Sequence, residues 1–499
     1  MKKFSIADLA RIIKASAFSV FRPPFHGGLR AQRDIQYEVQ DFTGISIDSR
    51  ITKPGDCFFA IPGENFDGHD FVPDAFAKGA VCAVVSKDIT RPDFYDKILL
   101  KVSDTVKVLG DFAREYRRQA SFKVVAITGS VGKTTTRHIA YHVLSRHFRV
   151  FQSPKNFNNN IGLPLTLLGA DPQDQIVIAE LGTNHPGEIG YLTRIAGPDI
   201  AVVTNVHPAH LEGFGDLETI IEEKLSIAEG LSQDGILIIN TDLVNWLNGD
   251  RLNHKIITFG KSDNADYRVS NITFDALGSR FAINGTEVYL PLPGPGNVEN
   301  ALAACAVCNQ LGLTIDDFAQ AVKTLPPLSM RAELLQIGTL TVLNDCYNAN
   351  PASMKNALDI LANLGSTPLD NSIKYKNGPK MKECLTGSTQ KRRLVFICGD
   401  MAELGRQTEL LHAELGASIA KARVQLLLAV GKFAKITTQA AKRTADSIQH
   451  NLQVECFEDT LSTCNNLQKF IKDYDIILVK GSRTAKLEVV VEKLKEPFS

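Results

Sequence analysis

The sequence lacks three features, each of which would have pointed to a specialised class of protein. Although 44% of the 499 residues are hydrophobic, no unbroken apolar run is long enough to span a bilayer. Neither sign of charge is in excess, because 55 Lys and Arg residues balance 55 Asp and Glu residues, which argues against a broad nucleic-acid-binding surface. The nine cysteines are scattered and odd in number, unlike a disulfide framework. We therefore expect a globular protein that neither inserts into a membrane nor binds nucleic acid.

The N-terminus and the cysteines favour the cytoplasm as the compartment. Asp8, Arg11 and Lys14 interrupt the apolar positions of the first residues, so this stretch predicts a short amphipathic helix rather than a signal peptide. Cys305 and Cys308 form a lone CxxC within an Ala-rich helical pattern, which favours core packing over zinc binding or redox chemistry. Buried free thiols are typical of cytoplasmic proteins.

The length predicts two to four domains, and changes of pattern along the chain divide it into three α/β domains. A chain of 499 residues exceeds what one hydrophobic core supports. Its pattern changes near Phe122 and again at Pro326-Pro327, a plausible hinge. Residues 365–393 show no periodicity and are rich in Lys, Gly, Ser and Thr, so we interpret them as a surface insertion with a basic end. We place the three domains at residues 1–115, 116–325 and 326–499.

From Phe122 onward, short apolar runs alternate with helical stretches. This alternation favours mostly parallel sheets covered by helices, with ligands bound at the carboxyl ends of the strands. Residues 261–292 are more β-like, and 297–311 predict an apolar, Ala-rich helix. The predicted strands are 44–47, 57–61 and 80–85 in the first domain, 124–127, 176–181, 200–203 and 236–239 in the second, and 340–343, 394–398, 424–430 and 476–479 in the third.

The stretch KVVAITGSVGKTTTRHIAYHVLS carries the strongest local signal. A buried strand, a glycine-containing turn at 129–134 and a helical pattern follow one another, which is the context that a phosphate-binding loop requires. Backbone N–H groups and a helix N-terminus can surround phosphate oxygens, Lys133 can reach the outer phosphates, and the Thr134 hydroxyl can bind Mg²⁺. Ile127 stands where the commonest pattern has its first Gly, so the loop has the shorter form G-x-x-G-K-T.

Other polar residues follow the neighbouring predicted strands. Glu180 closes its strand and can bind a metal ion alongside Thr134. His210 and Lys224, taken alone, are typical of an ordinary surface histidine and a solvated helix lysine. Ser49-Arg50 could hold a phosphate, although an exposed turn is the simpler interpretation.

The sequence as a whole resembles the Mur ligase family, ATP-dependent enzymes that form amide bonds in peptidoglycan precursors. The resemblance extends over nearly the whole chain. It rests on DSRITKPGDCFFAIPGENFDGHDF, ITGSVGKTTT, NFNNNIGLPLTLL, AELGTNHPGEI, NVHPAHLEGFG, PGPGNVENALAA, NDCYNANPASM, GDMAELG and VKGSRTAKLE. Within the family, it is most similar to the members that join D-alanyl-D-alanine to UDP-N-acetylmuramoyl-tripeptide.

The resemblance implies a division of labour among the three domains. The first would be a small α/β domain that binds the UDP end of the substrate, and the second a P-loop domain with a mostly parallel sheet that binds ATP and two Mg²⁺ ions. The third, Rossmann-like, would bind the incoming dipeptide. The implied reaction passes through an acyl phosphate, and the protein is expected to be a cytoplasmic monomer.

The resemblance also assigns roles to individual residues. Asn297 and Asn300 would lie by the adenine, Asp345 by the ribose and Arg331 by the phosphates. The implied ATP-binding residues are Gly129, Ser130, Gly132, Lys133, Thr134, Thr135, Asn297, Asn300, Arg331 and Asp345. The implied metal ligands are Thr134, Glu180, His210 and Lys224, the last as a carbamate formed with CO₂. The implied catalytic residues are Lys133, Lys224, His210 and Arg331. The implied substrate-binding residues are Ser49 and Arg50 at the UDP end, Asn184 and His185 at the peptide, and Tyr347 and Asn348 at the dipeptide, together with the GDMAELG and KGSR segments.

Two residues depart from the family pattern, and they keep alternatives open. The family usually has Asn in place of Val131 and often has His in place of Gly296. A sister ligase that adds another amino acid, or a folylpolyglutamate-type ligase, is the nearest alternative, although residues 1–115 speak against the folate type. A nucleotide-binding paralogue without turnover is a second class. A P-loop switch or motor ATPase has no support, since no separate apolar run ending in Asp stands out.

Overall fold

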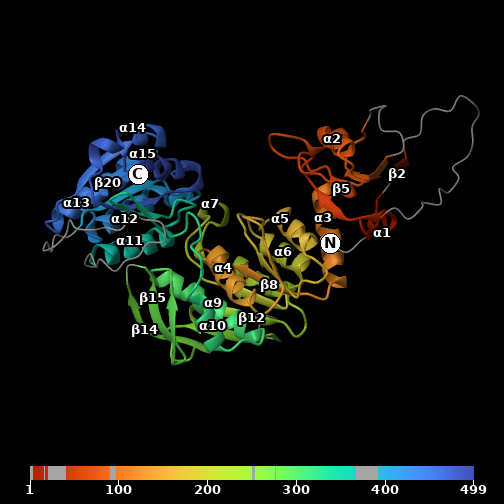
Figure 1. Cartoon of the computed structure of the whole chain (residues 1–499), viewed down its shortest axis with the longest axis horizontal. Helices are drawn as coiled ribbons and strands as arrows, with labels where there is room; N and C mark the ends of the chain where they lie inside the picture. The colour runs from red at the N-terminus through yellow and green to blue at the C-terminus, as the bar shows by residue number, and fades with distance from the viewer. Residues whose placement is uncertain are drawn as a thin grey trace, which may run out of the picture.

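The computed structural model describes residues 4–15, 17–20, 41–89, 97–249, 253–275, 277–366 and 392–498. Most of the predicted insertion at 365–393 therefore lies outside the described residues. Figure 1 shows three α/β regions in a row, with the middle region between the other two. Within the described ranges, no helix combines the length and apolar character needed to cross a membrane.

The N-terminal region is built on a five-stranded sheet in the order β2-β7-β6-β5-β4, beside a two-stranded pair, β1-β3. The strands from β4 to β7 are parallel neighbours, and β2 joins β7 antiparallel at the edge. The strands are β1 (Phe4–Ser5), β2 (Ala17–Val20), β3 (Asp41–Phe42), β4 (Gly44–Ser46), β5 (Asp56–Phe59), β6 (Cys82–Val85) and β7 (Ile98–Lys101). The helices are α1 (Ile6–Ile12), α2 (Val72–Ala77) and α3 (Thr105–Gln119).

The middle region contains a nine-stranded sheet in the order β16-β15-β14-β13-β12-β11-β8-β10-β9. It is parallel from β9 to β14 and antiparallel from β14 to β16. The strands are β8 (Lys123–Thr128), β9 (Val150–Gln152), β10 (Ile176–Glu180), β11 (Ile200–Val203), β12 (Ile236–Asn240), β13 (Lys255–Gly260), β14 (Tyr267–Phe274), β15 (Ser279–Ile283) and β16 (Thr286–Leu290). The helices are α4 (Lys133–Leu144), α5 (Gly162–Gly169), α6 (Glu188–Ala196), α7 (Leu211–Phe214), α8 (Leu217–Leu225), α9 (Pro295–Gln310) and α10 (Ile315–Val322).

The C-terminal region has a six-stranded sheet in the order β17-β18-β22-β19-β20-β21, in which only the β17-β18 pair is antiparallel. The strands are β17 (Glu333–Ile337), β18 (Leu340–Asn344), β19 (Leu394–Gly399), β20 (Leu426–Val430), β21 (Gln453–Phe457) and β22 (Ile476–Lys480). The helices are α11 (Pro351–Ser366), α12 (Thr408–Lys421), α13 (Ala434–Ser447), α14 (Thr460–Phe470) and α15 (Glu488–Phe498).

The predicted α/β class with large, mostly parallel sheets is confirmed. The apolar runs predicted as strands in the middle region are largely buried strands, because a parallel strand covered on both faces needs apolar residues at every position. The predictions missed β1, β2, β3, β7, β9, β13, β17 and β21, which are short or only partly buried. Each of the three predicted domains contains its own sheet, and the exact boundaries at 115/116 and 325/326 stay predictions. Cys305 and Cys308 are buried free thiols, as predicted.

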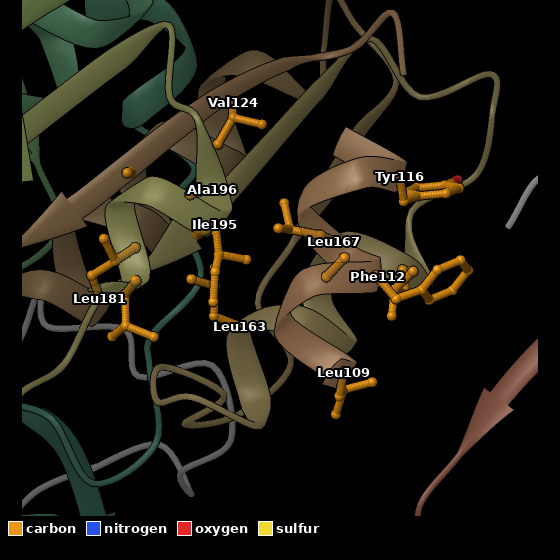
Figure 2. Packing of buried hydrophobic residues seen from close by; sticks show 14 of the residues in the cluster. Leu109, Phe112, Tyr116, Val124, Leu163, Leu167, Leu181, Ile195 and Ala196 are labelled. Atoms are coloured by element: carbon orange, nitrogen blue, oxygen red, sulfur yellow. The ribbon is translucent and has the colours of Figure 1, made fainter. Parts of the chain in front are cut away.

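One hydrophobic core joins the N-terminal region to the middle region. A single cluster of buried residues contains Leu109, Phe112 and Tyr116 of helix α3 together with Leu163, Leu167 and Ile195 of the neighbouring helices α5 and α6 (Figure 2). The Tyr116 hydroxyl also donates to the carbonyl of Ala170, at 3.1 Å. Helix α3 therefore belongs as much to the middle region as to its own.

We predict that Phe112→Ala destabilises this shared core by about 3–5 kcal/mol, because it leaves a cavity where a fully buried ring stood. Phe66→Ala is the matched control, since the Phe66 ring is 75% exposed. Urea denaturation followed by circular dichroism measures both variants. Equal loss of stability in the two would contradict the packing described here.

Candidate active site between the middle and C-terminal regions

A cavity of about 490 Å³ lies where the phosphate-binding loop faces the C-terminal region. The carboxyl ends of β8, β10 and β11, the start of α9 and the segment between β18 and α11 all reach it. The predicted site residues that line it are Ser130, Gly132, Lys133, Thr134, Thr135, Glu180, Asn184, His210, Asn297, Asn300, Arg331, Asp345, Tyr347 and Asn348. Those that do not are Gly129, His185, Lys224, Ser49 and Arg50.

Neighbouring residues on other elements fix the conformation of the phosphate-binding loop. Gly132 has φ +88°, and a Cβ there would overlap Oδ1 of Asn300 on α9. The N–H groups of Ser130 and Val131 donate to the backbone carbonyl and side-chain Oδ1 of Asn205, each at 3.0 Å. The backbone at Val131 is therefore braced by Asn205 although the side chain is apolar, which gives a physical account of how the loop keeps its shape without Asn at that position.

Lys133 begins helix α4 and points back across the loop. Its ammonium donates to the carbonyl of Gly129 at 2.7 Å. Burial lowers the pKa of Lys133 to about 8, with the charge of Glu180 opposing this shift and the charge of Arg331 adding to it. Arg331 comes from the C-terminal region, so the two cations face the same space from opposite sides.

Glu180 ends β10 and is only 2% exposed. The Thr134 hydroxyl donates to its Oε2 at 3.1 Å, and the backbone N–H of Glu180 donates to Ser153 Oγ at the same distance. Arg137 Nε lies 2.7 Å from Oε1, but the two atoms are not aligned as a hydrogen bond. Arg137 also donates to the carbonyl of Ser153. The sequence analysis missed Arg137, because nothing in the local pattern links it to Glu180.

These groups suit Mg²⁺. A carboxylate with one oxygen lacking a hydrogen bond, next to a hydroxyl, offers the hard oxygen donors that this ion prefers. Thr134 and Glu180 would hold the ion. Within the described ranges, no group of three or more His, Cys, Asp or Glu side chains gathers closely enough to form a complete protein cage. Such a partial set is typical of Mg²⁺, which keeps waters and substrate phosphates among its ligands.

His210 and Lys224 occupy different environments. His210 has φ +55° and contacts the carboxylate of Glu403 in the C-terminal region through Nδ1, a hydrogen bond that lowers the pKa of Glu403. Lys224 is buried on α8. Burial, followed by the charge of Lys133, lowers the pKa of Lys224 well below its ordinary value. The nearest acidic groups, Glu223 and Glu188, oppose this shift.

The loop that carries Asn184 and His185 is fixed by two carboxylates. Both backbone N–H groups donate to Oε2 of Glu188, at 2.7 and 3.1 Å. Glu223, next to Lys224, accepts the N–H groups of Gly187 and Ile189 at the start of α6. Asn184 reaches the cavity, whereas His185 does not line it.

The start of α9 explains the second departure from the family pattern. The N–H of Gly296 donates to Oδ1 of Asn356 on α11, at 3.0 Å, and a Cβ at 296 would come within 2.9 Å of the same atom. Asn300 and Asn297 form a weak chain of hydrogen bonds from Thr136 to Pro293. Asn356, which the sequence analysis missed, thus occupies space beside Gly296 and lines the cavity.

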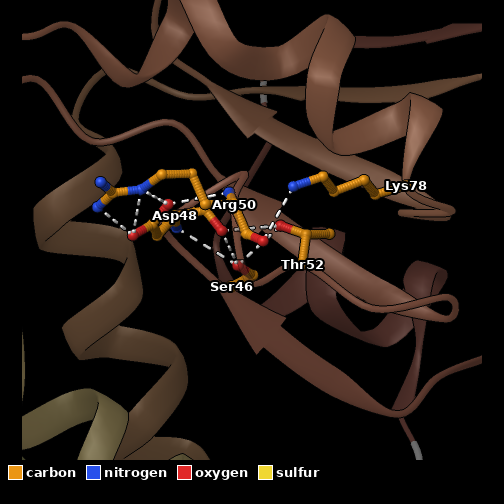
Figure 3. Close-up of polar contacts among 5 residues, drawn as sticks. All are labelled: Ser46, Asp48, Arg50, Thr52 and Lys78. Atoms are coloured by element: carbon orange, nitrogen blue, oxygen red, sulfur yellow. Dashed lines mark hydrogen bonds and ion pairs between the residues drawn. The ribbon is translucent and has the colours of Figure 1, made fainter.

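Ser49 and Arg50 lie on the N-terminal region and take no part in this cavity. Arg50 forms a two-pronged ion pair with Asp48, with contacts of 2.9 and 2.7 Å (Figure 3), and this pairing lowers the pKa of Asp48. Lys78 donates to the carbonyl of Arg50 at 2.9 Å. The guanidinium is largely exposed, so it is available to a ligand.

Models of three protein domain families match the chain in order. They are described as the Mur ligase family catalytic domain, over residues 41–117, the Mur ligase middle domain, over 127–308, and the Mur ligase glutamate ligase domain, over 377–483. The UDP-N-acetylmuramoyl-tripeptide–D-alanyl-D-alanine ligase of Bacillus subtilis (strain 168) is 33% identical over 466 residues, which cover 92% of this chain and 95% of that relative. The chain belongs to the Mur ligase family.

Solved structures of Mur ligases agree with this membership. A crystal structure of MurF from Acinetobacter baumannii superposes with a TM-score of 0.80 at 28% identity and covers 99% of both chains. The structure of MurF ligase from Thermotoga maritima in complex with ADP gives 0.74 at 26% identity, covering 91% of this chain and 97% of that one. The family resemblance predicted from the motifs is thereby confirmed.

We predict that Gly132→Ala weakens ADP binding at least tenfold and lowers the melting temperature, because the added Cβ would displace Asn300 as well as strain the backbone. Gly187→Ala is the matched control. It has the same φ of +88° but nothing within 4 Å of the new Cβ. Calorimetric titration with ADP and thermal unfolding measure both effects. The steric argument would be wrong if the two variants bound ADP equally well.

Proposed function

We propose that the protein is an ATP-dependent ligase that joins D-alanyl-D-alanine to the terminal carboxylate of UDP-N-acetylmuramoyl-tripeptide. The observation that carries this proposal is the cavity itself, in which Lys133, Thr134 and Glu180 face Arg331 from the C-terminal region. A site of this composition suits phosphoryl transfer between anions. The relatives matched over more than 90% of their length are UDP-N-acetylmuramoyl-tripeptide–D-alanyl-D-alanine ligases, which indicates the substrates. We further propose that the protein acts in the cytoplasm as a monomer.

The chemistry follows from the weakness of a carboxylate as an acylating agent. Transfer of the γ-phosphoryl group of ATP to the tripeptide carboxylate gives an acyl phosphate and ADP. The dipeptide amine then attacks the acyl carbon, the amide bond forms, and phosphate and a proton leave. Exclusion of water by the surrounding regions would protect the acyl phosphate from hydrolysis.

Two cations of this chain, Lys133 and Arg331, act on the transferring phosphoryl group in the proposed reaction. Lys133 and Arg331 neutralise the charge that develops on the transferring phosphoryl group, and both are positioned before ATP arrives. The first Mg²⁺ would be held by Thr134 and Glu180, and the second by His210 and carbamylated Lys224. Bound Mg²⁺ supplies further charge neutralisation at the phosphate oxygens. Asn297 and Asn300 would lie by the adenine and Asp345 by the ribose.

Carbamylation of Lys224 has physical support. CO₂ reacts with the neutral amine, giving an N-carboxylate and releasing a proton. Burial lowers the pKa of Lys224 well below its ordinary value, which raises the share of the neutral amine that can react with CO₂. The product carries a negative charge near the cation Lys133, whose charge disfavours the protonated form of Lys224.

The substrates are proposed to approach from two sides. Ser49 and Arg50 would bind the UDP end, while Asn184 and His185 would face the peptide. Tyr347 and Asn348, with the GDMAELG segment, would line the dipeptide side. A sister Mur ligase that adds another amino acid is the second candidate, because the phosphate-binding part of the site does not depend on the incoming amine.

The test is phosphate release in the presence of ATP, Mg²⁺ and UDP-N-acetylmuramoyl-tripeptide. We expect release to depend on D-alanyl-D-alanine and the ligated product to be detected by mass spectrometry. Single amino acids, including meso-diaminopimelate and lysine, serve as competing acceptors with the shorter UDP-muramyl peptides. Release that responds to a single amino acid but not to the dipeptide would favour the sister ligase and overturn the proposal.

Lys224→Ala is expected to lower kcat at least 100-fold, because the proposed second metal ion would lose its anionic ligand. Incubation with ¹³C-labelled CO₂ gives an independent readout, since a carbamate resonance is expected for the wild type and not for this variant. Lys323→Ala, at an exposed position after α10, is the control. Normal turnover of Lys224→Ala, or an unchanged resonance, would refute the carbamate.

A further inference from the structure

The ends of β18 and β22 bring an acidic and a basic side chain together. The two strands are parallel neighbours, with Asn344 opposite Val479. The next residues are Asp345 and Lys480, and the Asp345 N–H donates to the carbonyl of Val479 at 3.0 Å. Residues paired in this way point to the same side of a sheet, so the carboxylate and the ammonium meet at its edge.

Lys480 is only 2% exposed, and its ammonium has three acceptors. They are Oδ2 of Asp345 at 2.6 Å, the carbonyl of Asn348 at 2.9 Å and the carbonyl of Asp345 at 3.3 Å. An ammonium has three N–H donors, so all of them are used. Although Lys480 reaches the cavity wall, its hydrogen bonds go to the segment 345–348 rather than leaving a donor for a ligand.

The segment 345–348 in turn supports Arg331 at two places. Oδ1 of Asp345 accepts the N–H of Ala332, at 3.0 Å. The Tyr347 ring lies under the Arg331 guanidinium, with Cζ 4.1 Å from the ring centroid. Lys480 fixes the position of this segment through its three hydrogen bonds, so both contacts to Arg331 depend on Lys480.

The backbone around Arg331 requires such support. Met330 has φ +58° and Ala332 has φ +48°, so the arginine sits between two non-glycine residues in the left-handed region. Such a backbone conformation is strained for a residue with a side chain and persists only where the surroundings enforce it. A carboxylate accepts the N–H on each side: Glu333 accepts from Met330 at 2.9 Å, and Asp345 accepts from Ala332.

We propose that Lys480 is a positioning residue for Arg331. It holds Asp345 and Tyr347, which fix the strained turn and the guanidinium, so that Arg331 meets the transferring phosphoryl group without reorganising. The inference rests on the proposed function only in that Arg331 acts on a phosphoryl group. It concerns the phosphoryl-transfer half of the reaction and not the identity of the acceptor amine.

The test compares the affinity for Mg·ADP with that for Mg·ADP and aluminium fluoride, which mimics a phosphoryl group in transfer. We take the ratio of the dissociation constant for Mg·ADP to that for the aluminium fluoride complex, in which contacts with adenine and ribose cancel. We expect Arg331→Ala and Lys480→Met each to reduce this ratio, the latter by on the order of 100-fold, which is the cost of a misplacement of about 1 Å. The double variant is expected to lose no more than Arg331→Ala alone. Lys472→Met, at an exposed lysine of the same region, is the control.

Several results would overturn the inference. The first is a double variant whose loss equals the sum of the two single losses. The second is a Lys480→Met variant that loses as much affinity for Mg·ADP as for the aluminium fluoride complex. The third is a wild-type protein that binds the two ligands equally well. Lys480→Arg keeps a cation and is expected to restore part of the ratio. Should Lys480→Met fail to fold, Asp345→Asn breaks the same ion pair from the less buried side and must lower the ratio in the same way. Because no acceptor peptide is present, a failure of the ligase assay leaves this result unaffected.

Discussion

The burial of one carboxylate organises the centre of the molecule. Glu180 is buried where water barely reaches, and its carboxylate accepts from Thr134 and pairs with Arg137, while Ser153 accepts hydrogen bonds from the Glu180 backbone N–H and from Arg137. Those three residues come from the loop–helix junction, from α4 and from the segment after β9. The hydrogen bonds and the ion pair of Glu180 therefore fix the positions of three neighbouring elements, and with them the position of the phosphate-binding loop.

The C-terminal region completes the site through a small number of contacts. Leu211 and Phe214 of α7 are buried within the C-terminal core, and His210 just before them pairs with Glu403. On the other side of the cavity, Asn356 meets the backbone of Gly296. Arg331 thus reaches the phosphate-binding loop from a region that is attached at the two sides of the cavity.

Strands and loops whose structure depends on residues close together in the sequence could be predicted. Apolar runs such as 124–127 and 200–203 predicted buried strands because both faces are covered, and Gly132-Lys133-Thr134 predicted the loop because its geometry is local. The roles of Arg331 and Asp345 came only from the family resemblance. Arg137 and Asn356 were missed, and Lys480 was placed only within a segment at the dipeptide side, since each acts on a residue far along the chain that only the fold brings near.

The continuous core around α3 bears on the order in which substrates assemble. The surface that carries Arg50 and the loop that carries Lys133 are parts of regions sharing one packed interior. A nucleotide-sugar anchored at the first and a nucleoside triphosphate bound at the second would face each other before the C-terminal region takes part. The architecture therefore favours binding of both before the C-terminal region brings Arg331 for activation of the acid, with the amine recruited last.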